Sequence, residues 1–124
     1  MTLLLDTHVV IWWLTDDLTL SSEIKDRLDH EPEVYVSAAT IWEIAIKQAI
    51  GKIKEPERLP EIVRDSGFRN LPITPDHAIM AGQLPMIHRD PFDRMLVAQA
   101  RSENLVLASR DPAIQQYDVP VLVV

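Results

Sequence analysis

The chain contains no cysteine among its 124 residues, which excludes disulfide bonds and metal sites built on thiolates. A chain without cysteine is typical of a reducing compartment, so we expect a cytoplasmic protein. No apolar run approaches the roughly 18 residues that a membrane span needs, and no basic leader opens the sequence. Only three glycines occur against nine prolines, which indicates helices and strands joined by short, stiff turns.

Positive charge is also scarce. Twelve lysines and arginines are outnumbered by nineteen acidic residues, so the formal net charge is −7. A chain this acidic does not hold nucleic acid by bulk electrostatics. If it handles RNA or DNA, a bound divalent cation or a basic partner has to offset the acids locally. The hydrophobic fraction of 47% is that of an ordinary globular chain, and the length fits one domain over residues 1–124.

The chain opens with a short apolar stretch, Leu3–Leu5, that ends on Asp6. Three leucines without alternation predict a strand that is buried on both faces inside a parallel sheet. In open parallel sheets, ligands bind just beyond the carboxyl ends of the strands, which is where Asp6 lies. Asp6 is therefore either a functional acid or only the N-cap of the helix that we expect over residues 8–14.

The rest of the chain alternates between strand and helix patterns, which predicts βαβ units and a single three-layer α/β domain with a parallel sheet. Prolines, glycines and capping residues mark the boundaries of these elements. Further strands are expected over 34–36, 105–108 and 119–124, with a short extended piece at 71–73, and further helices over 21–28, 37–50, 60–67, 74–84 and 90–103, with a brief one after 111.

Four acidic residues share one position relative to these elements. Each lies just beyond the carboxyl end of a strand or in the first turns of a helix: Asp6, Glu43, Asp93 and Asp111. Several carboxylates in one crevice repel each other, and a hard divalent cation removes that repulsion. Carboxylate oxygens are the ligands that Mg²⁺ and Mn²⁺ prefer. The spacing alone permits this convergence without requiring it.

Structural roles are open to each acid as well. Asp111 precedes a proline, as an N-cap does, and Asp93 follows Asp90 at the spacing of a capping box. Glu43 is four residues before Lys47, a helix-surface pair that contributes only about 0.2–0.5 kcal/mol. This last role is the weakest, because apolar residues flank Glu43 and leave its helix little solvated face.

Taken in order, these motifs resemble the PIN-domain ribonucleases, and specifically the VapC-type toxins of bacterial type II toxin–antitoxin pairs. The matching stretches span essentially the whole chain: 3–8, 37–47 followed by Gly51 and Lys52, 88–94, and 105–111. The metal-binding acids of that family fall on Asp6, Glu43, Asp93 and Asp111, whereas Asp90 is a secondary acid suited to capping. Ser109 stands where threonine is more common, a mild departure that keeps the hydroxyl.

The resemblance implies a PIN-like three-layer fold with about five mostly parallel strands flanked by helices. It also implies dependence on Mg²⁺ or Mn²⁺, hydrolysis of single-stranded RNA, a homodimer and a cognate antitoxin, with no membrane association.

Other protein classes fit the sequence less well. A response-regulator receiver would need another acid directly after Asp6, where Thr7 stands. A haloacid-dehalogenase-type phosphatase would need an aspartate two residues after Asp6, where His8 stands. The remaining alternative is a non-catalytic PIN-like module that binds RNA or protein, although such modules usually lack one or more of the four acids.

Several other residues have two readings. His8 and His88 flank acid motifs, but a structural role is at least as good for each, so we leave both out of the predicted site. Basic residues near the acids either form a local phosphate track or are ordinary solvated surface charges, namely Arg89, Arg94, Arg110, Lys47, Lys52 and Lys54. The three tryptophans, Trp12, Trp13 and Trp42, fit a core or a subunit interface better than a base-stacking platform.

Overall fold

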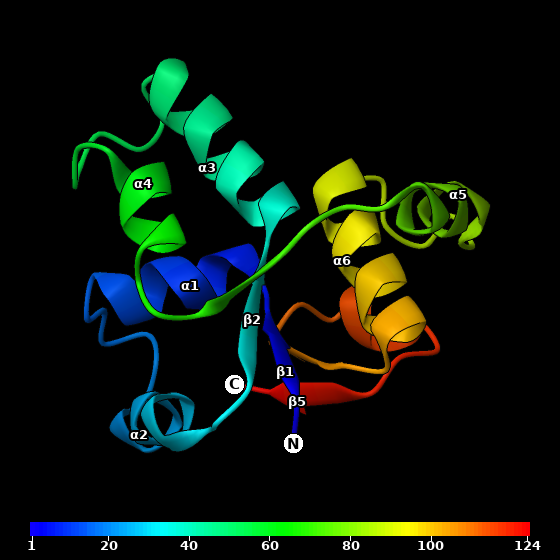
Figure 1. Cartoon of the computed structure of the whole chain (residues 1–124), viewed down its shortest axis with the longest axis horizontal. Helices are drawn as coiled ribbons and strands as arrows, with labels where there is room; N and C mark the ends of the chain where they lie inside the picture. Colours follow the sequence, from blue (N-terminus) through cyan, green and yellow to red (C-terminus); the bar gives the residue numbers. More distant parts are fainter.

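The computed structural model describes all 124 residues and contains one sheet of five strands (Figure 1). The strands lie in the order β3-β2-β1-β4-β5, and every neighbouring pair is parallel. The first strand is therefore central, as its unbroken leucine pattern predicts, and its three side chains are fully buried. The strand bounds are β1 (Leu3–Leu5), β2 (Val34–Ser37), β3 (Arg69–Leu71), β4 (Val106–Ser109) and β5 (Val121–Val123).

Helices cover both faces of the sheet and give the predicted three layers (Figure 1). On one face are α1 (Thr7–Leu14), α2 (Ser22–His30), α3 (Ala38–Ala49) and α4 (Leu59–Arg64). The other face carries α5 (Pro75–Gln83), α6 (Pro91–Glu103) and the short 3₁₀ turn η1 (Ile114–Gln116). No helix is both long enough and apolar enough to cross a membrane.

Two separate cores form because the side chains of β1 alternate between the two faces. Leu3 and Leu5 pack with residues of α1 to α4. Leu4 packs in the opposite direction, against α6 and η1. Complete burial of a leucine side chain stabilises a fold by about 1.5–3 kcal/mol relative to an exposed one, so β1 is held firmly from both sides. The residue that follows β1 consequently has a rigid support.

Capping residues fix where the helices at the carboxyl edge begin. Ser37 accepts a hydrogen bond from the amide of Ala39 at the start of α3. Asp90 caps α6 by accepting from the amides of Phe92 and Asp93, at 2.8 and 3.4 Å, which confirms its predicted role. Asp6 also occupies an N-cap position, but its side chain makes no capping hydrogen bond. Asp6 is therefore the N-cap of α1 by position, but its carboxylate does not cap the helix.

The third strand lies two residues earlier than predicted. We expected an extended piece at 71–73, whereas β3 covers Arg69–Leu71, with Tyr35 opposite Arg69 and Ser37 opposite Leu71. Pro72 has no amide hydrogen to donate to the ladder, so pairing stops before it. The last strand is likewise confined to Val121–Val123, after Pro120, rather than extending over 119–124.

Candidate metal centre

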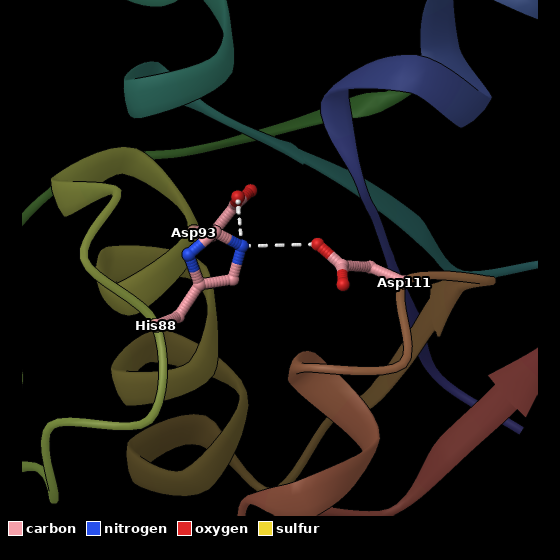
Figure 2. Close-up of side chains that lie close together, drawn as sticks. All are labelled: His88, Asp93 and Asp111. Atoms are coloured by element: carbon pink, nitrogen blue, oxygen red, sulfur yellow. Dashed lines mark hydrogen bonds and ion pairs between the residues drawn. The ribbon is translucent and has the colours of Figure 1, made fainter.

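Asp93 and Asp111 meet at one histidine at the carboxyl edge of the sheet. Figure 2 shows the ring of His88, from the segment before α6, between the carboxylate of Asp93 on α6 and that of Asp111 after β4. The Nε2 atom of His88 is 2.9 Å from Oδ2 of Asp93 and 3.0 Å from Oδ2 of Asp111. One donor atom from each of these residues lies within 4.8 Å of the others, close enough for one metal ion to be shared.

The protonation of His88 follows from its other ring nitrogen. Nδ1 accepts a hydrogen bond from the amide of Asp90 at 3.2 Å, so it carries no hydrogen, and we infer that the hydrogen is on Nε2. Nε2–H is then a donor shared by Asp93 and Asp111. This shared hydrogen reduces the repulsion between the two carboxylates, because the N–H bond places a partial positive charge between them.

Asp6 lies almost completely buried beside this group, with 4% of its surface exposed. Its Oδ2 accepts a 2.7 Å hydrogen bond from Ser109, but its Oδ1 is buried without any partner. Burial raises the pKa of Asp6, and the negative charge of Asp111 raises it further, while the Ser109 hydrogen bond and the charge of His8 lower it. Asp6 and Asp111 are therefore close enough to act on each other electrostatically.

Glu43, on α3, resembles Asp6 in having one carboxylate oxygen with a partner and one without. It is 6% exposed, and its Oε2 pairs with Lys47 at 2.9 Å, so the predicted helix pair with Lys47 is present. Its Oε1, however, is buried with no hydrogen-bond partner. An unpaired buried carboxylate oxygen is costly, so Glu43 and Asp6 each offer a lone pair that a further cation would satisfy.

Asp93 connects these acids into one group. Burial raises the pKa of Asp93 to about 7, and the charges of Asp6, Asp90 and Glu43 raise it as well, with His88 acting in the opposite direction. Asp6 and Glu43 therefore both lie within electrostatic reach of Asp93. Together with the effect of Asp111 on Asp6, these charge effects link each of the four predicted acids to at least one other. Donor atoms close enough to share one ion lie on His88, Asp93 and Asp111, and this group does not include Asp6 or Glu43.

His88 is the site residue that the sequence analysis left out. Its ring lies among the acids because the chain turns sharply at the Asp90 cap, which carries Asp93 back over it. The main chain is held there by a 2.8 Å hydrogen bond from the His88 amide to the hydroxyl of Tyr117. The available signal was a histidine two residues before an Asp-Pro helix start, next to a candidate acid.

Arg94 is neither part of a phosphate track nor a solvated surface charge, the two alternatives that the sequence left open. This side chain is buried, at 8% exposure, and its guanidinium donates to main-chain carbonyl oxygens of the segment before α6, namely those of Ala81, Leu84, Pro85 and His88. Lys47 is engaged with Glu43, as described above. Arg94 is therefore a structural clamp on the segment that carries His88, and it offers no charge to a substrate.

The donor set fits a hard divalent cation. It consists of carboxylate oxygens with one nearby imidazole, and two of the buried oxygens have no partner. Lys47 pairs with Glu43, His88 contacts Asp93 and Asp111, and the Ser109 hydroxyl and the Ala113 amide donate to Asp6 and Asp111 respectively. Oxygen-rich sites of this kind suit Mg²⁺ and Mn²⁺ rather than softer metals. Fold and site together define a parallel α/β domain with a candidate divalent-metal centre at the carboxyl edge of its sheet.

Comparisons with known proteins give the family. The profile of the PIN domain matches residues 3–120. Ribonuclease VapC22 of Mycobacterium tuberculosis is 32% identical over 127 aligned positions, which cover 96% of this chain and 94% of that protein. The chain therefore belongs to the PIN domain family, as a relative of the VapC ribonucleases.

Solved structures share the fold. The structure of VapBC2 from Rickettsia felis bound to a DNA fragment from its promoter superposes with a TM-score of 0.76 at 14% identity, covering 98% of both chains. FitAcB from Neisseria gonorrhoeae gives a TM-score of 0.70 at 25% identity, covering 98% of this chain and 97% of that one. The DNA-bound VapBC of Salmonella typhimurium gives 0.76 at 20%, with the same coverage. The predicted PIN-like fold is thus confirmed.

Proposed function

We propose that this protein is a metal-dependent endoribonuclease that hydrolyses single-stranded RNA and acts as the toxin of a type II toxin–antitoxin pair. The observation that carries the proposal is the pair of buried, unpartnered oxygens, Oδ1 of Asp6 and Oε1 of Glu43, beside Asp93 and Asp111. The likeness to Ribonuclease VapC22 supports the nuclease activity. The likeness to structures named as VapBC complexes supports the toxin role.

Four residues would hold Mg²⁺ or Mn²⁺ in this proposal: Asp6, Glu43, Asp93 and Asp111. When bound, one or two such ions supply the charge that activates water and stabilises the leaving oxygen of a phosphodiester. Asp6 is the anchor, because it follows the most deeply buried strand and Ser109 fixes one of its oxygens. His88 brings Asp93 and Asp111 together through its Nε2–H. Either carboxylate would give up this hydrogen bond when it binds a metal ion instead.

Water is the nucleophile in this proposal, because the chain offers no activated side chain in its place. There is no cysteine, and the two buried serines at this edge donate to groups other than histidine. The hydroxyl of Ser37 donates to Gln99, and that of Ser109 donates to Asp6. Loss of the 3′-oxygen after attack by water leaves 5′-phosphate and 3′-hydroxyl ends.

An unpaired RNA strand is the substrate that suits this edge, since splayed nucleotides can follow a groove that a stiff A-form duplex cannot enter. The alternative of a non-catalytic PIN-like binding module is disfavoured because all four acids are present and charge effects link them. An RNA substrate also fits activity in the cytoplasm.

The partner in this proposal is a small cognate antitoxin. Its C-terminal segment lies over the acids with an arginine or lysine directed at them, because a cationic side chain can replace a metal ion through charge-assisted hydrogen bonds. The net charge of −7 favours a basic peptide over bare RNA as a stable partner. The proposed homodimer has a candidate surface on α3 and its C-cap, where the apolar side chains of Trp42 and Ile50 are each 61% exposed.

The reaction is tested by incubating the purified protein with synthetic single-stranded RNA and Mg²⁺ and analysing the product ends. We expect 5′-phosphate and 3′-hydroxyl ends, no cleavage in EDTA, and no cleavage by Asp93→Asn. Asp76→Asn is the matched control, because Asp76 is an exposed acid in the first turn of α5, a helix that begins with a proline as α6 does. Cyclic phosphate ends, or cleavage that persists in EDTA, would falsify the hydrolytic mechanism.

The toxin role is tested separately in cells. Expression of the chain should arrest growth, Asp93→Asn should abolish the arrest, and co-expression of the product of the neighbouring gene should relieve it. The two gene products should also co-purify. Growth arrest that Asp93→Asn leaves intact would show that the arrest is unrelated to the acid group.

A further inference from the structure

A cavity of about 300 Å³ opens directly beside the candidate metal centre. Two of its lining residues, Asp6 and Asp111, belong to the acid group, so the cavity and the centre share a wall. The other lining residues have no part in the centre: His8, Trp12, Arg110 and Pro112. The volume is at the lower end of the range for small-molecule sites, about 300–1,000 Å³, which leaves room for one base or nucleoside.

The wall away from the acids is built from three flat groups. The guanidinium carbon of Arg110 lies 4.8 Å from the centroid of the Trp12 ring, in cation–π contact. The imidazole of His8, one turn earlier on α1, lies 5.8 Å from the same ring and is tilted from it by 38°. His8 and Arg110 are exposed and Trp12 is half-buried, so the wall is accessible to a ligand.

Arg110 is held in place before any ligand arrives. Its Nε donates to the carbonyl oxygen of Val124 and its Nη2 to that of Thr19, each at 2.9 Å. Its Nη1 makes no hydrogen bond within the chain, so donors remain for a ligand at a position that is already fixed. A fixed side chain loses little conformational freedom on binding, which favours affinity.

We propose that this cavity is a nucleobase subsite, which receives the base of the nucleotide adjoining the phosphate held at the acid group. Aromatic rings and guanidinium planes are the surfaces on which unpaired bases stack. Arg110 also supplies a positive charge on a chain of net charge −7, in a cavity that it lines together with Asp6 and Asp111. The inference rests on the proposed function, because the occupant is taken to be a nucleotide of the RNA substrate.

A purely structural reading explains less of this arrangement. Arg110 does join the chain end at Val124 to the loop at Thr19, and packing on Trp12 helps to hold it. That role requires neither the exposed ring of His8 nor an open cavity shared with Asp6 and Asp111. A base-binding wall accounts for all of these features together.

The subsite is tested first by nucleotide binding, which does not depend on cleavage. Each ribonucleoside 5′-monophosphate is titrated into the full chain with Mg²⁺, and tryptophan fluorescence is recorded, with ribose 5-phosphate as the ligand that lacks a base. We expect saturable quenching by at least one nucleotide and none by ribose 5-phosphate. Trp12→Leu should abolish the quenching. Trp13→Leu, the next residue on α1, whose ring packs against Phe68, should leave it intact.

Affinity is then measured by calorimetry with the nucleotide that quenches best. His8→Ala and Arg110→Lys should each weaken binding about tenfold, as expected for a stacked base that loses one flat partner. Trp12→Phe keeps a flat ring, so it should lose less nucleotide affinity than Trp12→Leu. His8 is exposed, so His8→Ala should fold normally, and its melting temperature verifies this.

Cleavage kinetics separate this inference from the proposed function. Removing the base next to the cleaved bond should raise KM at least tenfold for the wild type and clearly less for His8→Ala, with little effect on kcat in either. If RNA is cleaved but nucleotides bind no better than ribose 5-phosphate, or His8→Ala binds them as the wild type does, the subsite is overturned and the nuclease stands. If no RNA is cleaved, the proposed function fails, and nucleotide binding still decides whether the subsite exists.

Discussion

Ser109 donates a 2.7 Å hydrogen bond from its hydroxyl to Oδ2 of Asp6, although the two residues are 103 positions apart in the sequence. They meet because β1 and β4 are parallel neighbours, so their carboxyl ends lie side by side. The same hydroxyl oxygen accepts a 3.0 Å hydrogen bond from the amide of Asp111. One buried hydroxyl therefore positions two acids and leaves Oδ1 of Asp6 free for a further partner.

Ser109→Ala should lower the free energy of unfolding by about 1–3 kcal/mol, because it leaves Asp6 Oδ2 and the Asp111 amide without their partner. It should also raise the pKa of Asp6 further, since the lost hydrogen bond favours the charged carboxylate. Urea unfolding measures the stability. Ser109→Thr is the control. It keeps the hydroxyl, so its free energy of unfolding should fall by less than that of Ser109→Ala. Equal losses in the two variants would assign the effect to packing instead.

Mg²⁺ or Mn²⁺ should raise the melting temperature, because a ligand that binds only the folded state stabilises it. At a metal concentration of 100 times Kd the gain is about 2.7 kcal/mol. Asp6→Asn keeps the shape of the side chain and removes its charge, so it should largely abolish the metal-dependent rise. The exposed Asp76→Asn should leave that rise unchanged. Identical melting of wild type and Asp6→Asn, with and without metal, would show that the acids bind no cation.

The elements and the order of the acids were predictable because their signals are local. Three consecutive leucines indicate a strand buried on both faces, and Asp90 before a proline marks a helix start, whatever the rest of the chain does. The third strand gave no such signal. Arg69 and Asn70 are exposed at the edge of the sheet, and edge positions need no apolar pattern, so their pairing with β2 depends on tertiary context.

The position of His88 among the acids was not predictable for a related reason. It depends on the segment before α6, which is held by hydrogen bonds to Arg94 and Tyr117, both of them later in the chain. In the sequence, Arg94 has the appearance of a surface charge, since a buried arginine is rare and its carbonyl partners have no sequence signature. Convergence of the acids was inferable from strand ends, but the contacts that orient them were not.

The stability of the metal-free protein should depend on pH through Asp93. Its pKa is about 7 in the folded chain, raised chiefly by burial, against 3.8 for a free side chain. Between these pH values the folded state holds a proton that the unfolded state has lost, so the free energy of unfolding falls as the pH rises from about 4 to about 7. Asp93→Asn should flatten this decline, and thermal melts in EDTA measure it. If the free energy of unfolding of the wild type rises relative to that of Asp93→Asn as the pH increases from about 4 to about 7, the assignment is contradicted.

Arg94→Lys should destabilise the fold although it keeps the charge. The guanidinium donates to the carbonyl oxygens of Ala81, Leu84 and Pro85 at 2.8–3.0 Å, and a lysine ammonium cannot reproduce this planar arrangement. Loss of one or two hydrogen bonds from a charged donor lowers the free energy of unfolding by about 2–4 kcal/mol. Arg101→Lys, an exposed position on the same helix, should change it by less than about 0.5 kcal/mol.

Chemical denaturation of the two variants checks this difference. The segment that Arg94 clamps also carries His88, so Arg94→Lys should weaken Mg²⁺ binding, measured by calorimetry at a temperature where the variant is still folded. The physical reason is that His88 holds Asp93 and Asp111 within reach of each other, and a loosened segment lets them separate. If Arg94→Lys unfolds no more easily than Arg101→Lys, then Arg94 does not clamp the segment. If it unfolds more easily but binds Mg²⁺ as the wild type does, the clamp supports the fold without orienting the acids.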